Sequence, residues 1–363
     1  MQRKARVLAM YLPQYHPIPE NDAAWGKGFT EWTNVAQARP LFWGHYQPKI
    51  PADLGFYDLR MPEVREAQAE MAREAGIEGF MYWHYWFGNG KMLLERPFEE
   101  VLASGKPDFP FCLGWANHSW MTKTWKKGNV FQKNPMIMEQ LYPGHEDHVS
   151  HFNYCLPAFK DKRYIKVDNK PVFAVFSPKD MPDAQQFTST WQQLAKENGL
   201  PGIHFVGIRT SDVSIEDVLN MGFDAVNNRD MKQAQFKIEK CMLWSRIRIK
   251  LNDLGIPARY NYTKIVDYML SSEDMRVEVY PTILSGYDRT ARAGGKTVVY
   301  EHYNPTTFGE HVAKVIEKVS SKDFEHRIVF LKSWNEWGEG NYVEPDLKYG
   351  HGFLDALKKN IIG

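Results

Sequence analysis

Two glutamates near the end of the chain, Glu336 and Glu339, have the residue type and spacing of an acid–base pair. They follow an apolar run, 328–331, that predicts a buried strand, and Trp334 and Trp337 lie on either side of the first glutamate. Breaking a glycosidic bond needs one carboxyl group that gives a proton and another that accepts one, and indole rings stack on sugar faces. A surface turn with incidental acids is the alternative, but such turns are rich in Asn, Gly and Asp. The segment therefore predicts a sugar-cleaving site.

The two carboxyl groups must differ in pKa, because near neutral pH one has to be ionised and the other protonated. A nearby like charge and partial burial against Trp337 would raise the pKa of one of them. Their spacing of three places both on one side if the segment turns helically, and Gly338 and Gly340 allow a tight turn and a close approach of the sugar. Asn335 is expected to hold a sugar hydroxyl or to orient Glu336.

Length and composition limit the classes of protein to consider. A chain of 363 residues fits one large α/β barrel with insertions, or two domains. Lys plus Arg number 45 and Asp plus Glu 44, giving a net charge of +1, so nothing indicates nucleic acid or a strongly acidic partner. Aromatic residues make up 14%, a surplus that can line a carbohydrate cleft or fill a large core.

The cysteines and the N-terminus predict a cytoplasmic protein. Cys112, Cys155 and Cys241 lie far apart with no CxxC pair, which predicts reduced, buried thiols. The N-terminus is basic like a signal peptide, but the apolar run 7–12 stops at Pro13 and no cleavage site follows, so we predict a first strand there. No run approaches the roughly 18 apolar residues of a membrane span.

Short apolar, β-branched or aromatic runs recur along the chain and predict eight strands. Helical patterns lie between many of them, as at 62–75, 185–198 and 308–319. This alternation predicts a parallel sheet, and eight repeats predict a single α/β domain, 1–363, built as a closed (β/α)8 barrel of the TIM type. The predicted strands are Val7–Tyr11, Gly79–Tyr85, Phe111–Trp115, Val172–Ser177, His204–Ile208, Ala225–Asn227, Val279–Leu284 and Ile328–Ser333.

Polar and aromatic residues gather at the carboxyl ends of these predicted strands, the face on which barrel enzymes place their active sites. Their coincidence on one face is a stronger indication than any single cluster, although each aromatic residue could equally belong to the core. Arg209 and His84 could bind sugar hydroxyls or the carboxylate of an acidic sugar. The candidate substrate-binding residues are Tyr11, Gln14, Tyr15, His16, Glu31, Trp32, Trp83, His84, Tyr85, Trp86, Trp115, Asn117, His118, Trp120, Arg209, Tyr287, Trp334, Asn335, Trp337 and Glu344.

Three long insertions follow predicted strands, at about 17–61, 121–170 and 229–275. The first holds a Gly/Trp-rich stretch that either roofs the cleft or packs on the barrel rim. The second carries His145, His148 and His151 at helical spacing; a solvated helix face is favoured over a metal site, because no acid–His motif accompanies them.

The third insertion holds a basic amphipathic stretch, 237–250. Such a stretch covers the core with its charges in water or, as the weaker alternative, lies on an anionic membrane surface.

Six motifs spread along nearly the whole chain resemble those of WbsX-type proteins, which are similar to glycoside hydrolase family 99. The Asn-Glu-Trp-x-Glu-Gly element, 335–340, is the link to family 99. Relatives typically carry an acidic residue after the Asn of the Trp-Ala-Asn element, where this sequence has His118. A histidine there could donate to an acidic or N-acetylated sugar. The motifs are Tyr11–His16, Gly26–Val35, Tyr46–Pro48, Asp53–Leu59, Tyr82–Phe87 and Trp334–Gly340.

The resemblance implies a (β/α)8 barrel that acts on mannose-type α-glycosides with retention and without a metal or other cofactor. It implies that Glu336 deprotonates the substrate's own 2-hydroxyl, which attacks the anomeric carbon to form a 1,2-anhydro sugar. Glu339 would then protonate the leaving oxygen and activate the incoming water or sugar. This differs from the usual scheme, in which a carboxylate is the nucleophile.

Three functions remain open. A glycoside hydrolase or transglycosylase acting on a bacterial surface polysaccharide, such as a lipopolysaccharide O-antigen, is favoured. A glycosyltransferase of O-antigen or capsule biosynthesis is the second; the chain has no Asp-x-Asp motif and no Gly-rich phosphate loop after a strand, but a cytoplasmic location and the basic stretch fit a lipid-linked acceptor. A non-catalytic carbohydrate-binding barrel is the third. An oligo- or polysaccharide is the expected partner of each.

Overall fold

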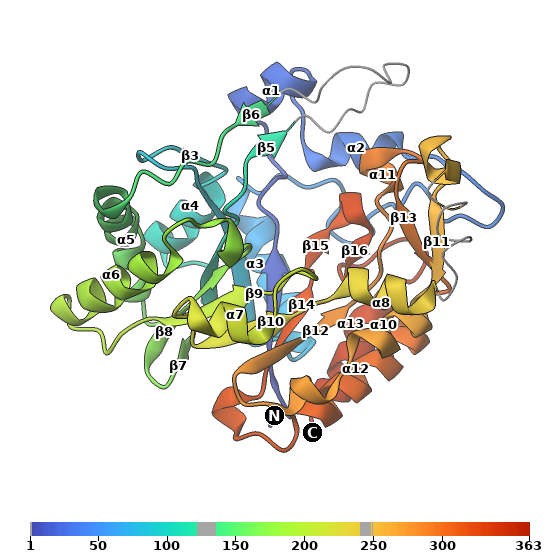
Figure 1. Cartoon of the computed structure of the whole chain (residues 1–363). Helices are drawn as coiled ribbons and strands as arrows, with labels where there is room; N and C mark the ends of the chain where they lie inside the picture. Colours follow the sequence, from blue (N-terminus) through green and yellow to red (C-terminus); the bar gives the residue numbers. More distant parts are fainter. Residues whose placement is uncertain (1, 122–135, 240–247, 249) are drawn as a thin grey trace.

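A computed structural model of the chain describes residues 2–121, 136–239, 248 and 250–363. Within these residues, eight parallel strands close into a barrel, confirming the predicted fold (Figure 1). Strand β1 pairs with both β14 and β2, which closes the cylinder. In order around the barrel, the strands are β1 (Arg6–Tyr11), β2 (Gly79–Trp86), β4 (Phe111–Trp115), β8 (Lys170–Val175), β9 (His204–Ile208), β10 (Ala225–Asn228), β12 (Val279–Leu284) and β14 (Ile328–Lys332).

The barrel strands read as near-continuous apolar runs because both of their faces are covered. All residues of β1, β4, β9 and β12 are buried. Strands β4, β9 and β12 have the predicted bounds, whereas β8 begins and ends two residues earlier than predicted. The chain leaves the sheet there because the Ser177 amide donates to the Asn117 side-chain oxygen at 2.8 Å, outside the strand ladder.

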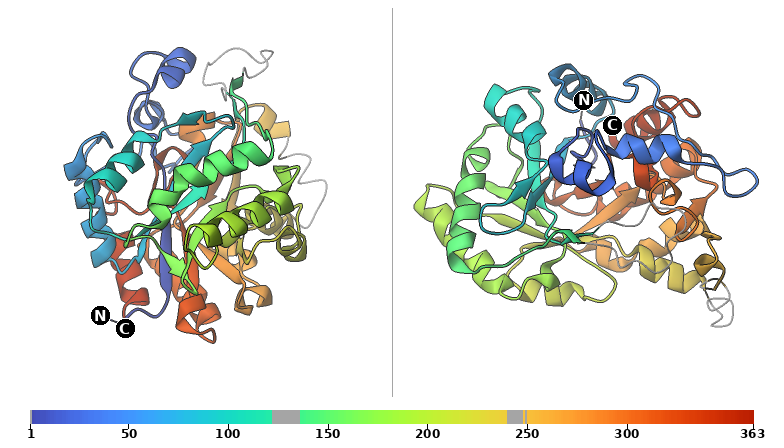
Figure 2. Two further views of the ribbon diagram at one scale, coloured as in Figure 1. Left: turned by 90° about the vertical axis from the view of Figure 1, so that its left-hand side faces the viewer. Right: turned by 90° about the horizontal axis from the view of Figure 1, so that it is seen from above.

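Helices surround the strands, as the view along the barrel shows (Figure 2). Local signals set their ends: at α12 the Asn304 side chain accepts from the amides of Thr306 and Thr307, and Pro305 occupies the first turn. The helices of this layer are α3 (Pro62–Glu74), α4 (Arg96–Ser104), α5 (His145–Phe159), α6 (Ala184–Glu197), α7 (Ile215–Asn220), α10 (Tyr262–Met269), α12 (Pro305–Val319) and α13 (Gly352–Ile361). The three helical segments predicted from the sequence correspond to α3, α6 and α12.

Shorter elements gather at the end of the barrel opposite the two termini (Figure 1). They belong to the loops that follow the strands, so they lie over the carboxyl ends of β1, β2, β4, β10, β12 and β14. These elements are α1 (Pro19–Trp25), α2 (Glu31–Gln37), β3 (Met92–Leu93), β5 (Trp120–Met121), β6 (Met136–Met138), α8 (Met231–Ile238), β11 (Ala258–Asn261), α11 (Thr290–Ala293), β13 (Val298–Glu301), β15 (Asn335–Glu336), the 3-10 turn η4 (Trp337–Glu339) and β16 (Asn341–Tyr342).

The histidines of the second insertion differ from the prediction. His145 is exposed, but His148 and His151 are buried, so the expected solvated face is wrong for these two. Helix α5 turns them inward because it packs on the barrel and on α6: the His151 ring stacks on Trp86 with centroids 4.6 Å apart and also meets Trp191.

Other predictions have mixed outcomes. Cys112 and Cys155 are free and buried, as predicted, while Cys241 lies outside the described residues. Most of the basic stretch 237–250 also lies outside them, since 240–247 and 249 are not described. Among the described residues, no helix has the length and apolar character needed to cross a membrane.

Candidate active site

A cavity of about 550 Å³ opens over the carboxyl ends of the strands, and both glutamates of the predicted pair line it. A smaller cavity of about 160 Å³ adjoins it and shares the residues Gln14, His118, Trp120, Arg289 and Arg292. Of the candidates predicted from the sequence, those that line the larger cavity are Gln14, Trp83, Tyr85, His118, Trp120, Arg209, Tyr287, Glu336 and Glu339.

The segment after β14 turns sharply and directs both glutamates to the same cavity. Glu336 ends β15 and Glu339 lies one turn later in η4, which gives the helical turn that the spacing of three requires. The Glu336 amide donates to the Ser333 hydroxyl at 3.0 Å, and Gly340 closes the turn in the left-handed conformation, with φ at 62°. Asn335 holds the segment to the end of β1, exchanging two hydrogen bonds of 2.8 and 3.0 Å with the backbone of Leu12.

Gly338 allows a third carboxylate, that of Glu31, to approach the pair. A Cβ atom built on Gly338 would lie 1.7 Å from the Glu31 carboxylate oxygen, so no other residue fits without displacing this side chain. Glu31 begins α2 and is 1% exposed. In the Gly/Trp-rich first insertion, Trp32 is packed into the core and Glu31 lines the smaller cavity.

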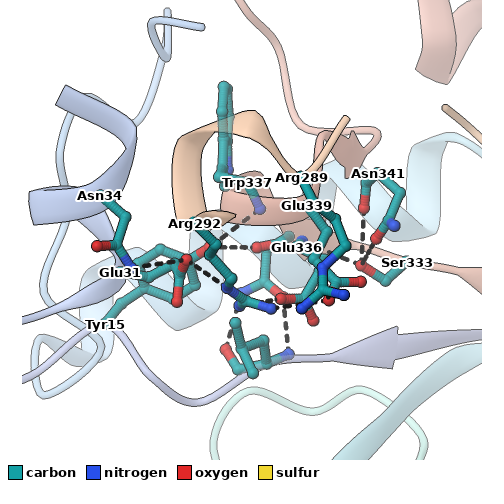
Figure 3. Close-up of polar contacts among 12 residues, drawn as sticks. Tyr15, Glu31, Asn34, Arg289, Arg292, Ser333, Glu336, Trp337, Glu339 and Asn341 are labelled. Atoms are coloured by element: carbon teal, nitrogen blue, oxygen red, sulfur yellow. Dashed lines mark hydrogen bonds and ion pairs between the residues drawn. The ribbon is translucent and has the colours of Figure 1, made fainter. Parts of the chain in front are cut away.

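One arginine joins the three carboxylates (Figure 3). Arg292, on α11, donates from Nε to Glu31 at 2.8 Å and from Nη1 to Glu339 at 3.0 Å, and its Nη2 donates to Glu336. Each nitrogen of the guanidinium therefore has its own carboxylate, a use of the planar fork that lysine could not reproduce. Arg292 holds the three acids of the site in a fixed arrangement.

The two members of the pair have opposite pKa shifts. Burial raises the pKa of Glu336, against the opposing charge of Arg292. Burial works in the same direction at Glu339, but Lys332 and Arg289, each 3.2 Å from its carboxylate, act together with Arg292 and hold its pKa well below the ordinary value. Glu339 is therefore the ionised member of the pair and Glu336 the more readily protonated one.

A second buried network positions the arginines. Asp288, 2% exposed, accepts from Gln47 at 2.7 Å and from the ammonium group of Lys49 at 3.1 Å, and pairs with His45 at 2.9 Å. Its other oxygen accepts from the amide and hydroxyl of Thr290, the first residue of α11. The carboxylate thus ties the first insertion to the loop that carries Arg289 and Arg292.

Comparison with known proteins identifies the family. The sequence model of the family described as Glycosyltransferase WbsX matches residues 7–357. The chain belongs to this family. It is also 33% identical, over 98% of its length, to the "Uncharacterized protein WxcX" of Xanthomonas campestris pv. campestris and of its strain B100. The chain spans 49%, about half, of the length of these curated relatives.

Solved structures share the fold of this WbsX-family chain. A "Glycoside hydrolase-like protein" aligns with a TM-score of 0.62 and 16% identity, covering 99% of this chain and 94% of that one. The GH99 endo-alpha-mannosidase from Bacteroides thetaiotaomicron aligns with a TM-score of 0.57 and 13% identity, covering 98% and 95%. At such identities the likeness shows a shared barrel.

Several candidates from the C-terminal motif lie beneath the cavity instead of lining it. The Trp337 indole donates to Glu344 at 2.6 Å, and the same carboxylate accepts from Gln68 at 2.6 Å and from Tyr57 at 2.9 Å. Glu344 is 2% exposed, and its burial raises its pKa to about 7. Trp334 is fully buried in the core. These side chains cannot touch a sugar, because the sharp turn that exposes Glu336 and Glu339 directs them inward.

Candidates near the first strand support the site from behind. Tyr11 donates to Gln68 at 2.7 Å, and the Tyr15 hydroxyl donates to the carbonyl of Asn335. Trp32 donates to the carbonyl of Tyr57 at 2.8 Å, and the His16 Nδ1 lies 3.1 Å from the carbonyl of Pro13, to which it donates. None of the four lines either cavity, and all four side chains are buried.

A third group of candidates is held by hydrogen bonds behind the strands, and Trp86 and Trp115 of this group pack against α5. Trp86 donates to Asp147 at 3.0 Å, Trp115 donates to the carbonyl of Trp86 at 2.8 Å, and Asn117 donates to the carbonyl of Ser177 at 2.8 Å. The strand alternates its side chains, so Trp83 and Tyr85 face the cavity while the even-numbered residues of this stretch point to the helix layer.

His84, from the same stretch, belongs to a buried cluster that could hold a metal ion. Within the described part of the chain, the one group with suitable ligand atoms is His84, His151 and Cys155, whose atoms lie within 4.8 Å of one another. The two imidazoles are already hydrogen-bonded to each other at 2.9 Å, and burial lowers the pKa of both. The cluster lies away from the cavity and offers a substrate no access.

Arg209 is the one cationic candidate among the described residues that line the cavity. The others that line it, which were not candidates, are Arg229, Lys232, Arg289, Arg292 and Lys332. Arg229 and Lys332 stand at the ends of predicted strands, so the position rule that selected Arg209 applies to them too. Arg289 and Arg292 follow the seventh strand by five and eight residues, and no local pattern in the sequence distinguishes them.

Proposed function

We propose that this chain is a carbohydrate-active enzyme that acts on glycosidic bonds of a polysaccharide, with Glu336 and Glu339 as its acid–base pair. One observation carries the proposal: both carboxylates face one cavity on the carboxyl-end face of the barrel and have opposite pKa shifts. A pair of titrating groups whose surroundings separate their pKa values is what acid–base catalysis requires. Trp83, Tyr85, Trp120 and Tyr287 are the aromatic residues proposed to contact the sugar.

We favour hydrolysis or transglycosylation within a bacterial surface polysaccharide. The fold is shared with proteins described as a glycoside hydrolase-like protein and a GH99 endo-alpha-mannosidase. The substrate would be a saccharide chain, so the cavity has to admit part of one. Its volume of about 550 Å³ is in the range of ordinary small-molecule sites.

The division of roles between the two glutamates has two solutions. The resemblance to family 99 assigns the base to Glu336 and the acid to Glu339. The charges of the unliganded site favour the reverse, because Lys332 and Arg289 stabilise the anion of Glu339. For the resemblance to hold, a bound sugar has to loosen these two cations from Glu339, so that it can carry a proton.

Glutamine variants test the pair. Glu336→Gln and Glu339→Gln are each expected to lower turnover at least about a hundredfold, the usual size of acid–base catalysis. Glu63→Gln, at an exposed position of α3, is the matched control and should leave turnover unchanged. Products are measured by mass spectrometry after incubation with α-mannosides and O-antigen oligosaccharides. Turnover within threefold of the wild type in either variant would remove that residue from the mechanism.

An activated leaving group separates the two role assignments. A substrate whose leaving group departs without protonation restores the first step in the variant that lacks the acid, and leaves the variant that lacks the base inactive. Rescue of Glu339→Gln supports the assignment from the resemblance, and rescue of Glu336→Gln supports the assignment from the charges.

A glycosyltransferase is the second candidate, favoured by the description of the family and by the cations of the cavity, which suit a phosphate-bearing donor. Calorimetry with nucleotide sugars discriminates: binding in the micromolar range, and product formation that depends on the nucleotide sugar, would favour transfer.

A non-catalytic carbohydrate-binding barrel is the third candidate. A double glutamine variant of the pair that keeps full biological activity would favour it. A cytoplasmic location and membrane contact through 237–250 stay predictions, and most of 237–250 lies outside the described part of the chain.

A further inference from the structure

The cavity is locally cationic although the chain is nearly neutral. Among the described residues that line it, six carry a positive charge and three a negative one, whereas the whole chain has 45 basic and 44 acidic residues. The six come from the ends of four consecutive strands, β9, β10, β12 and β14, and from the loops that follow them. They are Arg209, Arg229, Lys232, Arg289, Arg292 and Lys332.

Most of these cations are already engaged by carboxylates. Arg289, Arg292 and Lys332 surround the catalytic pair. Arg209 lies 3.5 Å from the Asp230 carboxylate and donates to Asn228 at 3.0 Å. Their charges are balanced within the protein, so they do not by themselves call for a charged ligand.

Two cations remain, and of these Lys232 is exposed to solvent. Arg229 is partly buried. Within the described residues, its guanidinium makes no hydrogen bond and no ion pair; it lies over the Phe176 ring, 4.7 Å from the centroid. Glu339 is near enough to act on it electrostatically, but the oxygens of Glu339 are already held by Lys332, Arg289 and Arg292. Arg229 is therefore a half-buried charge that no carboxylate of the described residues pairs with.

The surroundings of Arg229 orient it toward the cavity. A cation held on an aromatic face loses little entropy when it binds, because the ring already fixes its plane. The Phe176 ring also meets Trp83, with centroids 5.7 Å apart, and His118, at 5.0 Å. Phe176 thus places Arg229 beside two ring-bearing residues that also line the cavity.

We propose that the substrate of this site carries an oxyanion, a carboxylate or a phosphate, that binds Arg229 beside Phe176. The inference rests on the proposed function, because it names the chemistry of the sugar that Glu336 and Glu339 act on. A guanidinium pairs with either group through two parallel hydrogen bonds. The carboxylate would belong to an acidic sugar residue, and the phosphate to a sugar linked through phosphate to a lipid or nucleotide.

Calorimetric titration of the full chain tests the inference without turnover. Methyl α-D-glucuronoside and methyl α-D-glucoside differ only at C6, and inorganic pyrophosphate represents the phosphate. We expect at least one of the two anions to bind at least about tenfold more tightly than the glucoside, the least that one charge-assisted pair provides. Preference for the glucuronoside assigns an acidic sugar, and preference for pyrophosphate assigns a phosphate-linked one.

Arg229→Gln should weaken binding of the preferred anion at least about tenfold and change glucoside binding less than threefold. Arg39→Gln, at an exposed position outside the cavities, is the matched control and should bind all three as the wild type does. Equal affinity of the wild type for all three compounds, or anion binding that survives Arg229→Gln, overturns the inference. The comparison of the three compounds on the wild-type chain still tests the inference if Arg229→Gln does not fold.

These results are separable from the proposed function. Full turnover in the glutamine variants of Glu336 and Glu339 would remove the acid–base pair and leave anion binding at Arg229 measurable. Loss of turnover in those variants, together with no preference for an anion, would support the proposed enzyme activity and rule out the proposed oxyanion on the substrate.

Discussion

The two sides of the cavity differ in chemistry. Strands β1, β2 and β4 and their loops contribute Gln14, Trp83, Tyr85, His118 and Trp120, which are aromatic or neutral polar side chains. Strands β9, β10, β12 and β14 contribute the arginines and the lysine that surround the carboxylates. A sugar held between them would meet stacking surfaces on one side and fixed charges on the other. The first side suits recognition of ring shape, and the second suits stabilisation of charge.

The buried carboxylates beneath the two sides show the same contrast. Asp288 supports the cationic side; burial opposes its charge, but Lys49, with His45 and Thr290, holds its pKa well below the ordinary value. Glu344 supports the segment that carries the pair and has neutral donors as its hydrogen-bond partners, so burial raises its pKa to about 7. Asp288 is stabilised as an anion by a neighbouring cation, whereas burial brings Glu344 close to protonation at neutral pH.

Removing the charge of Asp288 should have the largest effect on stability. Asp288→Asn leaves the ammonium group of Lys49, 1% exposed, without a counter-charge, and breaking a buried pair in this way costs about 3–5 kcal/mol. Urea unfolding at pH 7 measures the loss. Asp267→Asn, which removes the exposed partner of Lys314, is the control and should cost less than about 1 kcal/mol. Similar losses for the two variants would contradict the buried network.

The same contrast predicts opposite pH dependences. The pKa of Asp288 is lowered on folding, so its contribution to stability is present at neutral pH and is lost as the pH falls. The pKa of Glu344 is raised, so its contribution is complete below about pH 4.5 and is lost as the pH rises through about 7.

The Glu344 shift corresponds to about 3 kcal/mol. We expect the stability of the wild type relative to Glu344→Gln to fall by about that amount between pH 4.5 and pH 8, as measured by urea unfolding. Glu310→Gln, exposed on α12, provides the flat reference. A constant difference between wild type and Glu344→Gln across this range would show that Glu344 titrates normally.

Arg292→Gln tests the charged side directly. It removes the cation that joins Glu31, Glu336 and Glu339, and we expect turnover to fall about a hundredfold, as for other losses of a fixed charge in a site. The pKa values of Glu336 and Glu339 rise when a neighbouring cation is removed, so the acidic limb of the pH–rate profile should move to higher pH.

The control for Arg292→Gln is Arg276→Gln. Arg276 also binds three glutamates, Glu216, Glu273 and Glu278, but it does so on the surface. The Arg276→Gln substitution should leave both turnover and the pH–rate profile unchanged. A purely structural role of Arg292 would lower activity without moving the pH profile.

The sequence was sufficient for the barrel and for one side of the site. Apolar runs identified each barrel strand, because a parallel strand covered on both faces is apolar throughout. The spacing of Glu336 and Glu339 and the rule that sites lie at strand ends led to Gln14, Trp83 and Tyr85. The cationic side was missed because arginine is common on any protein surface, and its partners lie far away in sequence: Arg292 binds Glu31 across 261 positions.

Sequence reasoning also could not tell which aromatic residues face the cavity. Trp83 and Trp86 belong to one motif, but one lines the cavity and the other packs against α5. Glu344 was assigned to the substrate, whereas it binds Trp337 beneath the turn. Orientation at a sharp turn depends on a few backbone angles, such as the positive φ of Gly340, and no side-chain pattern records them.

Trp83→Leu tests the neutral side and should have the smallest effect. Leucine keeps the site apolar but removes the stacking face, so we expect the KM of a neutral oligosaccharide to rise about tenfold, the equivalent of one aromatic contact, with kcat nearly unchanged. Trp43→Leu, at a fully exposed position lining a different cavity, is the control. If Trp83→Leu lowers kcat and leaves KM unchanged, the division into a side that recognises shape and a side that handles charge is wrong, because the aromatic face would then act in the transition state.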